Sequence, residues 1–319
     1  MAFRHIVVAG GGVLGAQIAF QTAFKGFDVT IWLRSEGSIG RTEPKLERLY
    51  NVYRAEIARV EAALRAGEPL ELPRGFGAAD SVKSEADIQR LYEAVERAKK
   101  NLELSLDLEQ CAEEADFIIE SMAEDRDAKR EFYAKLAPYL DDKTIVATNS
   151  STMIPSMFSD LLPHPENYLA LHFANNIWRS NTAEVMGHSG TSKEAFAAVL
   201  AFAAEIGMIP LELHKEQPGY ILNSMLVPFL SSAEMLWANE VADPETIAKT
   251  GKLGTGSPLG PFQILDIVGL QTAYNIVSMN PESKNPESTP GKIAAGLKAK
   301  IDAGKTGINA GEGFYRYEK

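Results

Sequence analysis

Apolar residues in the first part of the chain recur with two spacings, one typical of buried strands and one typical of helices. His5–Ala9 is a short, largely apolar run, as expected of a buried strand, and Val13–Phe24 has apolar residues at helical spacing and no proline. Residues 28–33, DVTIWL, are rich in β-branched side chains and predict a second strand. A strand, a helix and a strand within about 30 residues have the size of a parallel crossover. The start of the chain therefore predicts a β-α-β unit.

After this unit the alternation of strands and helices breaks and then resumes. Residues 41–65 and 86–100 are rich in Glu, Arg, Lys, Leu and Ala with apolar positions at helical spacing, so the region of about 41–100 is predicted to be a helical insertion. The insertion has two interpretations, a solvated pair of helices or a flap over a substrate. Beyond it, the pattern predicts strands at 102–106, 117–120, 144–147, 168–173, 183–186 and 209–213, and helices at 128–140 and 192–206.

Strand patterns fade beyond Lys215. The apolar positions that follow have helical spacing, in the stretches 220–239, 244–253, 263–279 and 291–303. The predicted fold class is therefore α/β plus all-α. A doubly wound sheet with the helical insertion occupies residues 1–214, and a helical domain occupies residues 215–319.

Charge and cysteine content narrow the range of partners. The formal net charge is −11, so the chain lacks the basic face that nucleic acid needs, although a few local cations are enough for a small anion. Cys111 is the only cysteine, and no Cys/His pair has zinc-ligand spacing, so we expect no metal, no disulfide and a cytoplasmic location. The first residues lack the apolar stretch of a signal peptide. No apolar run approaches the ~18 residues of a membrane span, so we expect no membrane partner.

The sequence GGGVLG at residues 10–15 fits the pattern G-x-G-x-x-G between the first predicted strand and the first predicted helix. Gly10 allows a tight turn, Gly12 lets the backbone approach a pyrophosphate, and Gly15 lets the helix pack on the strand. Val13 and Leu14 begin the helix, whose free N–H groups suit phosphate oxygens. A plain glycine turn is the alternative. The position within a β-α-β unit favours a Rossmann domain that binds NAD or NADP.

The end of the second predicted strand bears on the choice between these two cofactors. An acidic residue usually stands there and binds the ribose 2′-hydroxyl. Here the strand ends in Trp32-Leu33-Arg34-Ser35, without an acid. Arg34 and Ser35 suit a 2′-phosphate, so we expect that NADP is preferred or tolerated. In the alternative, Arg34 only stacks on the adenine and NAD remains usable.

Candidate catalytic residues lie at the ends of predicted strands, where wound sheets place ligands. His172 ends the strand 168–173, and Glu184 lies in the strand 183–186. Oxidation of a hydroxyl to a carbonyl needs a base, and a neutral imidazole has a suitable proton affinity near neutral pH. A buried carboxylate would orient the ring and stabilise its protonated form. Asn149 and Ser151 follow another strand, where a hydroxyl could reach the substrate oxygen or simply cap a helix.

Several segments together resemble one family. TIVATNSST resembles its T-I-x-A-S-N-T-S-S segment, LHFANN resembles L-H-F-F-N-P, and KEQPGYILNSMLVPFL resembles K-D-x-P-G-F-I-V-N-R-L-L-x-P-Y. SPLGPFQILDIVGL and GEGFYRYEK resemble two further family segments in the same order. By these motifs the chain resembles the L-3-hydroxyacyl-CoA dehydrogenase family, the two-domain Rossmann type of fatty-acid and butanoate metabolism that includes 3-hydroxybutyryl-CoA dehydrogenases.

This resemblance implies roles for particular residues. His172 would be the acid/base and Glu184 its partner, Ser151 would hydrogen-bond the substrate oxygen, and Asn223 would help to polarise the keto group. The residues implied at the cofactor, besides the glycine turn, are Glu124, Lys129, Asn149 and Asn175. The resemblance also implies an acyl-CoA substrate bound beside the insertion, and a homodimer formed through the helical domain.

Departures from the family pattern leave the substrate open. Asn176 replaces a proline, Ser224 replaces an arginine, and Leu33 replaces the ribose-binding acid. One alternative is a dehydrogenase of a free 3-hydroxy acid such as gulonate or carnitine. Arg179 could bind the carboxylate of such an acid, or it is a solvated surface cation. The other alternative is a dinucleotide-binding protein without catalysis, as in crystallins of this fold.

Overall fold

The computed structural model describes residues 3–78 and 80–317, and the chain divides into two compact units, Met1–Ile221 and Leu222–Lys319. The prediction placed the division at residue 214. The first unit extends to Ile221 because the turn after the last strand still packs on the sheet: Tyr220 lies in a small core with Ala170 and Met186. Each unit is described by itself.

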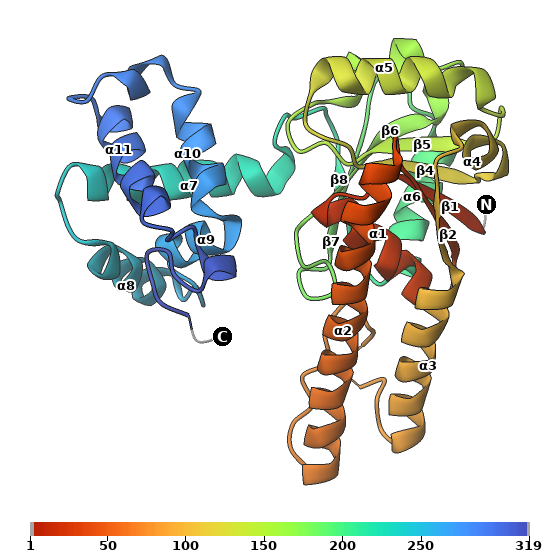
Figure 1. Cartoon of the computed structure of the whole chain (residues 1–319), viewed down its shortest axis with the longest axis horizontal. Helices are drawn as coiled ribbons and strands as arrows, with labels where there is room; N and C mark the ends of the chain where they lie inside the picture. The colour runs from red at the N-terminus through yellow and green to blue at the C-terminus, as the bar shows by residue number, and fades with distance from the viewer. Residues whose placement is uncertain (1–2, 79, 318–319) are drawn as a thin grey trace. The chain divides into compact units, whose positions relative to one another are not determined.

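The first unit contains an eight-stranded sheet of order β3-β2-β1-β4-β5-β6-β7-β8 (Figure 1). β6 and β7 are antiparallel and every other neighbouring pair is parallel. The strands are β1 (His5–Ala9), β2 (Asp28–Trp32), β3 (Leu102–Ser105), β4 (Phe117–Glu120), β5 (Ile145–Thr148), β6 (Tyr168–Phe173), β7 (Thr182–Gly187) and β8 (Ile209–Leu213). The strand order reverses between β1 and β4, and ligands of wound sheets bind at such a switch point. The predicted doubly wound sheet is confirmed.

The sheet is buried on both faces, as its alternating core residues show. Ile6 and Val8 pack into one core, with residues of α1 (Val13–Phe24) and α6 (Lys193–Glu205), whereas Val7 and Ala9 pack into the other. The second core includes residues of α4 and α5. The helices and turns of the first unit between β3 and β6 are α4 (Leu108–Glu114), α5 (Arg126–Leu136), η1 (Ala137–Tyr139), η2 (Pro155–Met157), η3 (Ser159–Leu161) and η4 (Pro165–Asn167).

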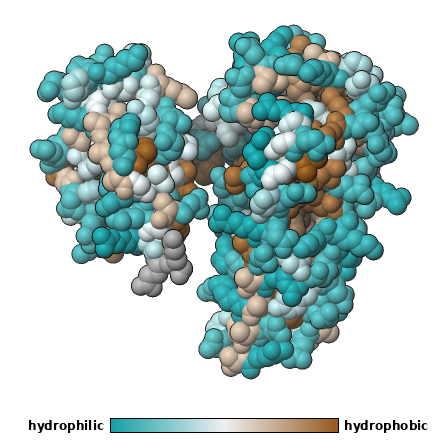
Figure 2. Space-filling model, viewed as in Figure 1, coloured by the Kyte–Doolittle hydropathy of each residue, from teal (hydrophilic) through white to brown (hydrophobic). Residues whose placement is uncertain are grey.

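The predicted insertion is a helical hairpin, and α2 (Glu36–Ala66) and α3 (Glu85–Asn101) run side by side (Figure 1). α2 begins directly after β2, five residues before the predicted insertion, so its first turns lie beside the glycine turn. Tyr53 is fully buried in the first core, and its hydroxyl donates to Gln21 Oε1 over 2.6 Å. The visible outer surface of the hairpin is mostly hydrophilic (Figure 2). One face of the insertion is thus packed into the domain core, and its other face is solvated.

The second unit is helical, as predicted. Leu230, Phe262, Leu265, Leu270 and Leu297 form the centre of its core. Gly269, with a φ of 94°, separates α9 from α10, where one continuous helix was predicted. The elements are α7 (Tyr220–Ala238), which continues from the first unit, α8 (Pro244–Thr255), α9 (Pro261–Val268), α10 (Leu270–Ser278), η5 (Pro281–Lys284), α11 (Thr289–Asp302) and η6 (Ile308–Ala310).

Helix α7 is unusually apolar. Among the described helices, α7 alone is long and apolar enough to cross a membrane, by length and composition only. The expectation of no continuous apolar run of that length did not single out this helix, because Asn223 and Glu234 interrupt the run but leave the average hydropathy high. One such helix is weak evidence for a membrane. Only 17% of its window is buried within the structure, so α7 presents an apolar surface.

Candidate active site

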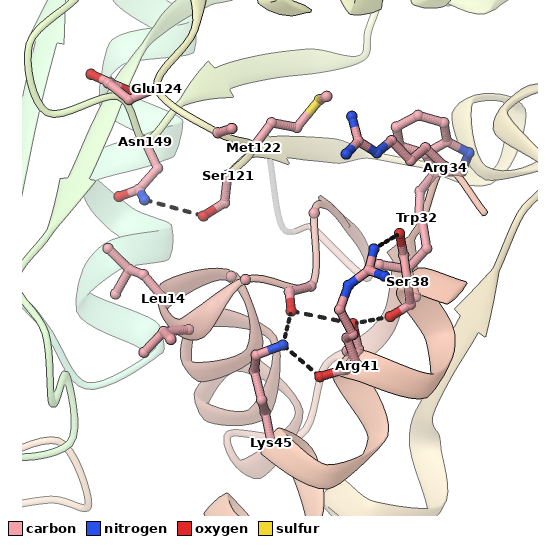
Figure 3. A pocket seen from close by; sticks show the side chains of 18 of the residues that line it. Leu14, Trp32, Arg34, Ser38, Arg41, Lys45, Ser121, Met122, Glu124 and Asn149 are labelled. Atoms are coloured by element: carbon pink, nitrogen blue, oxygen red, sulfur yellow. Dashed lines mark hydrogen bonds between the residues drawn. The ribbon is translucent and has the colours of Figure 1, made fainter. Parts of the chain in front are cut away.

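A cavity of about 490 Å³ lies where the polypeptide leaves β1, β2, β4 and β5 (Figure 3). Most of the residues predicted at a cofactor lie on its wall: Gly10, Gly12, Val13, Leu14, Gly15, Arg34, Glu124 and Asn149. Ser151, predicted to contact substrate, lies there too. Three other residues predicted at the cofactor do not line the described part of the cavity: Ser35, Lys129 and Asn175.

The glycine turn fits a dinucleotide. Gly10 has a φ of 122°, and a Cβ there would lie 2.5 Å from the carbonyl oxygen of Ser121. A Cβ on Gly15 would lie 2.1 Å from the carbonyl oxygen of Gly10. Gly12 faces open space and caps α1 without a side-chain hydrogen bond, so the first N–H groups of α1 are available to a pyrophosphate. The residues present therefore suit NAD or NADP.

Glu124 and Asn149 lie at one end of the cavity (Figure 3). The Glu124 carboxylate accepts hydrogen bonds from Ser150 Oγ (2.5 Å) and from the Thr152 N–H (2.9 Å) and Oγ1 (2.7 Å). Partial burial acts to raise the pKa of Glu124, but these hydrogen bonds and the charge of Lys129 outweigh it, so the pKa lies below its usual value. Glu124 is therefore a fixed anion at this end.

Lys129 lies behind the wall rather than on it. Its side chain is fully buried, with Nζ 2.5 Å from Glu120 Oε1 and 3.7 Å from Glu124 Oε2. Glu120 also accepts from the Met122 N–H (2.7 Å) and Thr148 Oγ1 (2.7 Å). Lys129 therefore neutralises a buried carboxylate that holds the loop after β4. Sequence reasoning missed Glu120, although its place as the last residue of an apolar strand was a usable signal.

His172 and Glu184 are brought together by the pairing of two strands. They are opposite each other in the antiparallel register of β6 and β7, and His172 Nδ1 lies 3.0 Å from Glu184 Oε2. On the other side of the ring, Nε2 lies 3.2 Å from Ser151 Oγ. His172 and Glu184 are 4% and 3% exposed. A carboxylate that accepts from Nδ1–H leaves Nε2 to exchange a proton with a substrate.

Tyr220 and Ile221 complete this arrangement, and sequence reasoning missed both. The Tyr220 ring stacks on the imidazole of His172, and the Ile221 N–H donates to Glu184 Oε1 over 2.8 Å. Burial, followed by the charges of Glu124 and Glu184, raises the pKa of the Tyr220 phenol, so the ring is neutral. Tyr220 is the first residue of a predicted helix, and no spacing in the sequence indicates that it contacts His172 on a strand.

The other predicted residues lie elsewhere. Asn175 is exposed in the loop after β6, and Asn223 belongs to the second unit, on α7. Arg179 forms a bidentate ion pair with Glu56 of α2, with Nε–Oε1 and Nη2–Oε2 distances of 2.7 Å each. Arg179 is therefore an exposed surface cation whose guanidinium is already engaged by a carboxylate of the chain itself.

Comparisons with known proteins cover almost the whole chain. Residues 5–217 match the family described as 3-hydroxyacyl-CoA dehydrogenase, NAD binding domain, and residues 219–317 match its C-terminal domain. The mitochondrial hydroxyacyl-coenzyme A dehydrogenase of Homo sapiens is 28% identical, over 99% of this chain and 91% of its own. A probable 3-hydroxybutyryl-CoA dehydrogenase of Bacillus subtilis is also 28% identical, over 100% of this chain and 99% of its own.

Solved structures extend the comparison. A diketoreductase, described by its substrate-directed dual catalysis of dicarbonyl compounds, is 42% identical with a TM-score of 0.83, over 99% of this chain and 100% of its own. FadB2 of M. tuberculosis is 25% identical with a TM-score of 0.74, over 100% of both chains.

Proposed function

The chain belongs to the 3-hydroxyacyl-CoA dehydrogenase family of nicotinamide-dependent oxidoreductases, and we propose that it interconverts short-chain (S)-3-hydroxyacyl-CoA and 3-ketoacyl-CoA by hydride transfer. The observation that supports this most is the position of His172. Its Nδ1 is engaged by Glu184, and its Nε2 lies beside Ser151, a residue of the cavity wall.

In the direction of oxidation, His172 Nε2 takes the proton of the substrate hydroxyl, and the hydride leaves C3. The positive charge that forms on the imidazole is stabilised by the Glu184 carboxylate. Ser151 donates a hydrogen bond to the same substrate oxygen and orients it. In reduction, the imidazolium returns the proton to the oxygen as the carbonyl becomes an alcohol. Asn223 would assist by polarising the keto group.

The cofactor, when bound, accepts or supplies the hydride. The glycine turn and the first turn of α1 would hold its pyrophosphate, with Val13 and Leu14 beside it. Glu124 and Asn149 would contact the nicotinamide half, and Lys129 would act through Glu124. Asn175 would approach the ring from the loop after β6. We propose that NADP is preferred over NAD, because Leu33 replaces the usual acid and Arg34 and Ser35 follow it.

The class of substrate has two candidates. The relatives named as hydroxyacyl-coenzyme A dehydrogenase and 3-hydroxybutyryl-CoA dehydrogenase support a thioester. The 42% identical diketoreductase supports a free dicarbonyl compound, and a 3-ketoacyl thioester is itself a 1,3-dicarbonyl. A free 3-hydroxy acid has less support, since Arg179 is paired with Glu56. The intact pair of His172 and Glu184 argues against an inactive binding protein.

We also propose a homodimer through the second unit. Apolar side chains on α7 are exposed in the single chain: Met225 is 63%, Phe229 40% and Met235 47% exposed. A second copy of the helix would remove this surface from water. For the compartment we propose the cytoplasm, since the one thiol, Cys111, is buried and unpaired.

The proposed reaction is tested by a panel of substrates with both cofactors. Acetoacetyl-CoA, free acetoacetate and an uncharged 1,3-dicarbonyl compound are each incubated with NADPH or NADH, and loss of the reduced cofactor is followed by absorbance. Turnover of acetoacetyl-CoA above the two free compounds supports the proposal. Turnover of the uncharged dicarbonyl compound alone favours the second candidate, and no turnover of any compound contradicts both.

A further inference from the structure

Three cations gather at one end of the cavity. Arg34, Arg41 and Lys45 lie on its wall with Ser38, and Figure 3 shows this group at the end opposite to Glu124 and Asn149. These four side chains are called the basic end of the cavity. Three of them come from the first turns of α2, which begin directly after β2.

The cations of the basic end have no acidic partner in the described part of the chain, since no carboxylate there lies within ion-pair distance of Arg34, Arg41 or Lys45. Farther along the same helix, by contrast, Arg54 pairs with Glu96 and Arg65 pairs with Glu61. In a chain with a net charge of −11, three neighbouring cations without a counter-charge create a local positive potential over the cavity.

Hydrogen bonds hold Ser38, Arg41 and Lys45 of the basic end in place and leave most of their donors available. Arg41 Nη2 donates to Ser38 Oγ over 2.9 Å, and Ser35 Oγ lies 3.0 Å from the same oxygen. Lys45 Nζ donates to the Gly11 carbonyl over 3.2 Å, so it is tied to the glycine turn. A guanidinium has five N–H donors in a planar fork, and most of those on Arg41 remain available. Ser35, though off the wall, supports Ser38.

Leu33 provides no hydrogen-bond acceptor for the 2′-hydroxyl of an unphosphorylated ribose. The side chain is 3% exposed, and its Cδ2 lies 2.9 Å from the position of a Cβ on Gly11. It therefore packs against the glycine turn, beside the place where a family acid would accept a hydrogen bond from the ribose. Leucine accepts no hydrogen bond, and its replacement of the acid also removes a charge that would repel a phosphate.

We propose that Arg41, Arg34 and Ser38 form a subsite for the 2′-phosphomonoester of an adenosine ribose, with Arg41 as the main determinant of cofactor choice. This inference rests on the proposed function only in placing the adenosine half of the cofactor at this end. The phosphate is a dianion with three acceptor oxygens, which matches two guanidinium groups and a hydroxyl. The positive end of the α2 dipole adds to the same attraction.

The test measures ligand binding by calorimetry and needs no turnover. The probes are 2′,5′-ADP, 5′-ADP and 3′,5′-ADP, the last because the adenosine of coenzyme A carries its phosphate on the 3′-oxygen. The wild-type chain should bind 2′,5′-ADP about tenfold or more tightly than either other nucleotide, as expected for charge-assisted hydrogen bonds. Equal affinity for 2′,5′-ADP and 5′-ADP, or tighter binding of 3′,5′-ADP, would overturn the inference.

Substitutions test whether Arg41 causes the preference for 2′,5′-ADP over 5′-ADP. Arg41→Ala should weaken 2′,5′-ADP binding by about tenfold or more and leave 5′-ADP binding within about twofold. The matched control is Arg48→Ala. Arg48 is an exposed arginine farther along α2 that does not line the described part of the cavity, so its substitution should change neither affinity. Leu33→Asp should reverse the preference towards 5′-ADP. An Arg41→Ala variant that binds 2′,5′-ADP as the wild type does would overturn the assignment.

Failure of this inference differs from failure of the proposed function. A chain that prefers 2′,5′-ADP but reduces no keto compound keeps the subsite and loses the proposed reaction. A chain that reduces acetoacetyl-CoA but binds 5′-ADP as well as 2′,5′-ADP keeps the reaction and loses the subsite.

Discussion

The phenol ring of Tyr220 stacks on the imidazole of His172, with ring centroids 4.4 Å apart and planes inclined by 17°. Hydrogen bonds at Nδ1 and Nε2 alone would let the imidazole tilt about the line that joins these atoms. Contact with one face removes that freedom. The backbone makes this possible through positive φ angles at Gly219 (81°) and Tyr220 (53°). The left-handed conformation costs a residue such as tyrosine about 1–3 kcal/mol, which is typical of functional sites.

The first prediction concerns this stack. Tyr220→Leu should lower kcat by about tenfold or more, because a tilted imidazole aims Nε2 away from the substrate oxygen. The KM for the cofactor should change little, since Tyr220 is absent from the described wall of the cavity. Tyr220→Phe keeps the ring and should restore most of kcat. A leucine variant with wild-type kcat, or a phenylalanine variant as slow as the leucine one, would contradict this account.

The second prediction concerns the buried pair beneath the cofactor site. Lys129→Met removes the counter-charge of Glu120 and should lower the free energy of unfolding by about 3–5 kcal/mol. The matched control is Lys135→Met in the same helix, where Lys135 pairs with Glu131 at the surface, and a loss of at most about 1 kcal/mol is expected. Denaturant unfolding measures both. Equal losses in the two variants would show that burial of Lys129 does not matter.

The third prediction concerns the pH dependence of stability. Glu234 is 4% exposed, and its Oε1 has no hydrogen-bond partner among the residues that the structure describes. Burial raises the pKa of Glu234 from 4.5 to about 7. The folded chain therefore binds this proton more tightly than the unfolded chain. The stability that Glu234 permits is fully present below pH 4.5 and declines as the pH rises towards about 7.

Glu234→Gln removes this titration. Relative to the wild type, the variant should gain stability between pH 5 and pH 8, by an amount on the order of 2–3 kcal/mol. Denaturant unfolding of both proteins at the two pH values measures the difference. If the variant and the wild type differ by the same free energy at both pH values, Glu234 does not titrate in this range.

The sequence predicted the main parts of the candidate site because their residues follow or end strands. Apolar runs place β1, β5, β6 and β7 within a residue or two, and their ends carry the glycine turn, Ser151 and His172. Contacts that depend on tertiary packing were not accessible. The burial of Lys129 requires the position of Glu120 on a neighbouring strand, and the stack of Tyr220 requires a left-handed turn that no helical spacing reveals. The early start of α2, which brings Arg41 to the cavity, was missed because Glu36–Gly40 lacks an apolar periodicity.

The central claim is that His172 carries the proton, and the most direct test compares His172→Ala with the wild type in the reduction of acetoacetyl-CoA. The kcat/KM of the variant should fall by roughly 10²–10⁴-fold, the usual contribution of general acid–base catalysis. Cofactor affinity, measured by calorimetry on the same preparation, should be unchanged, because the imidazole is absent from the described wall of the cavity. A His172→Ala variant with wild-type kcat/KM would contradict the account.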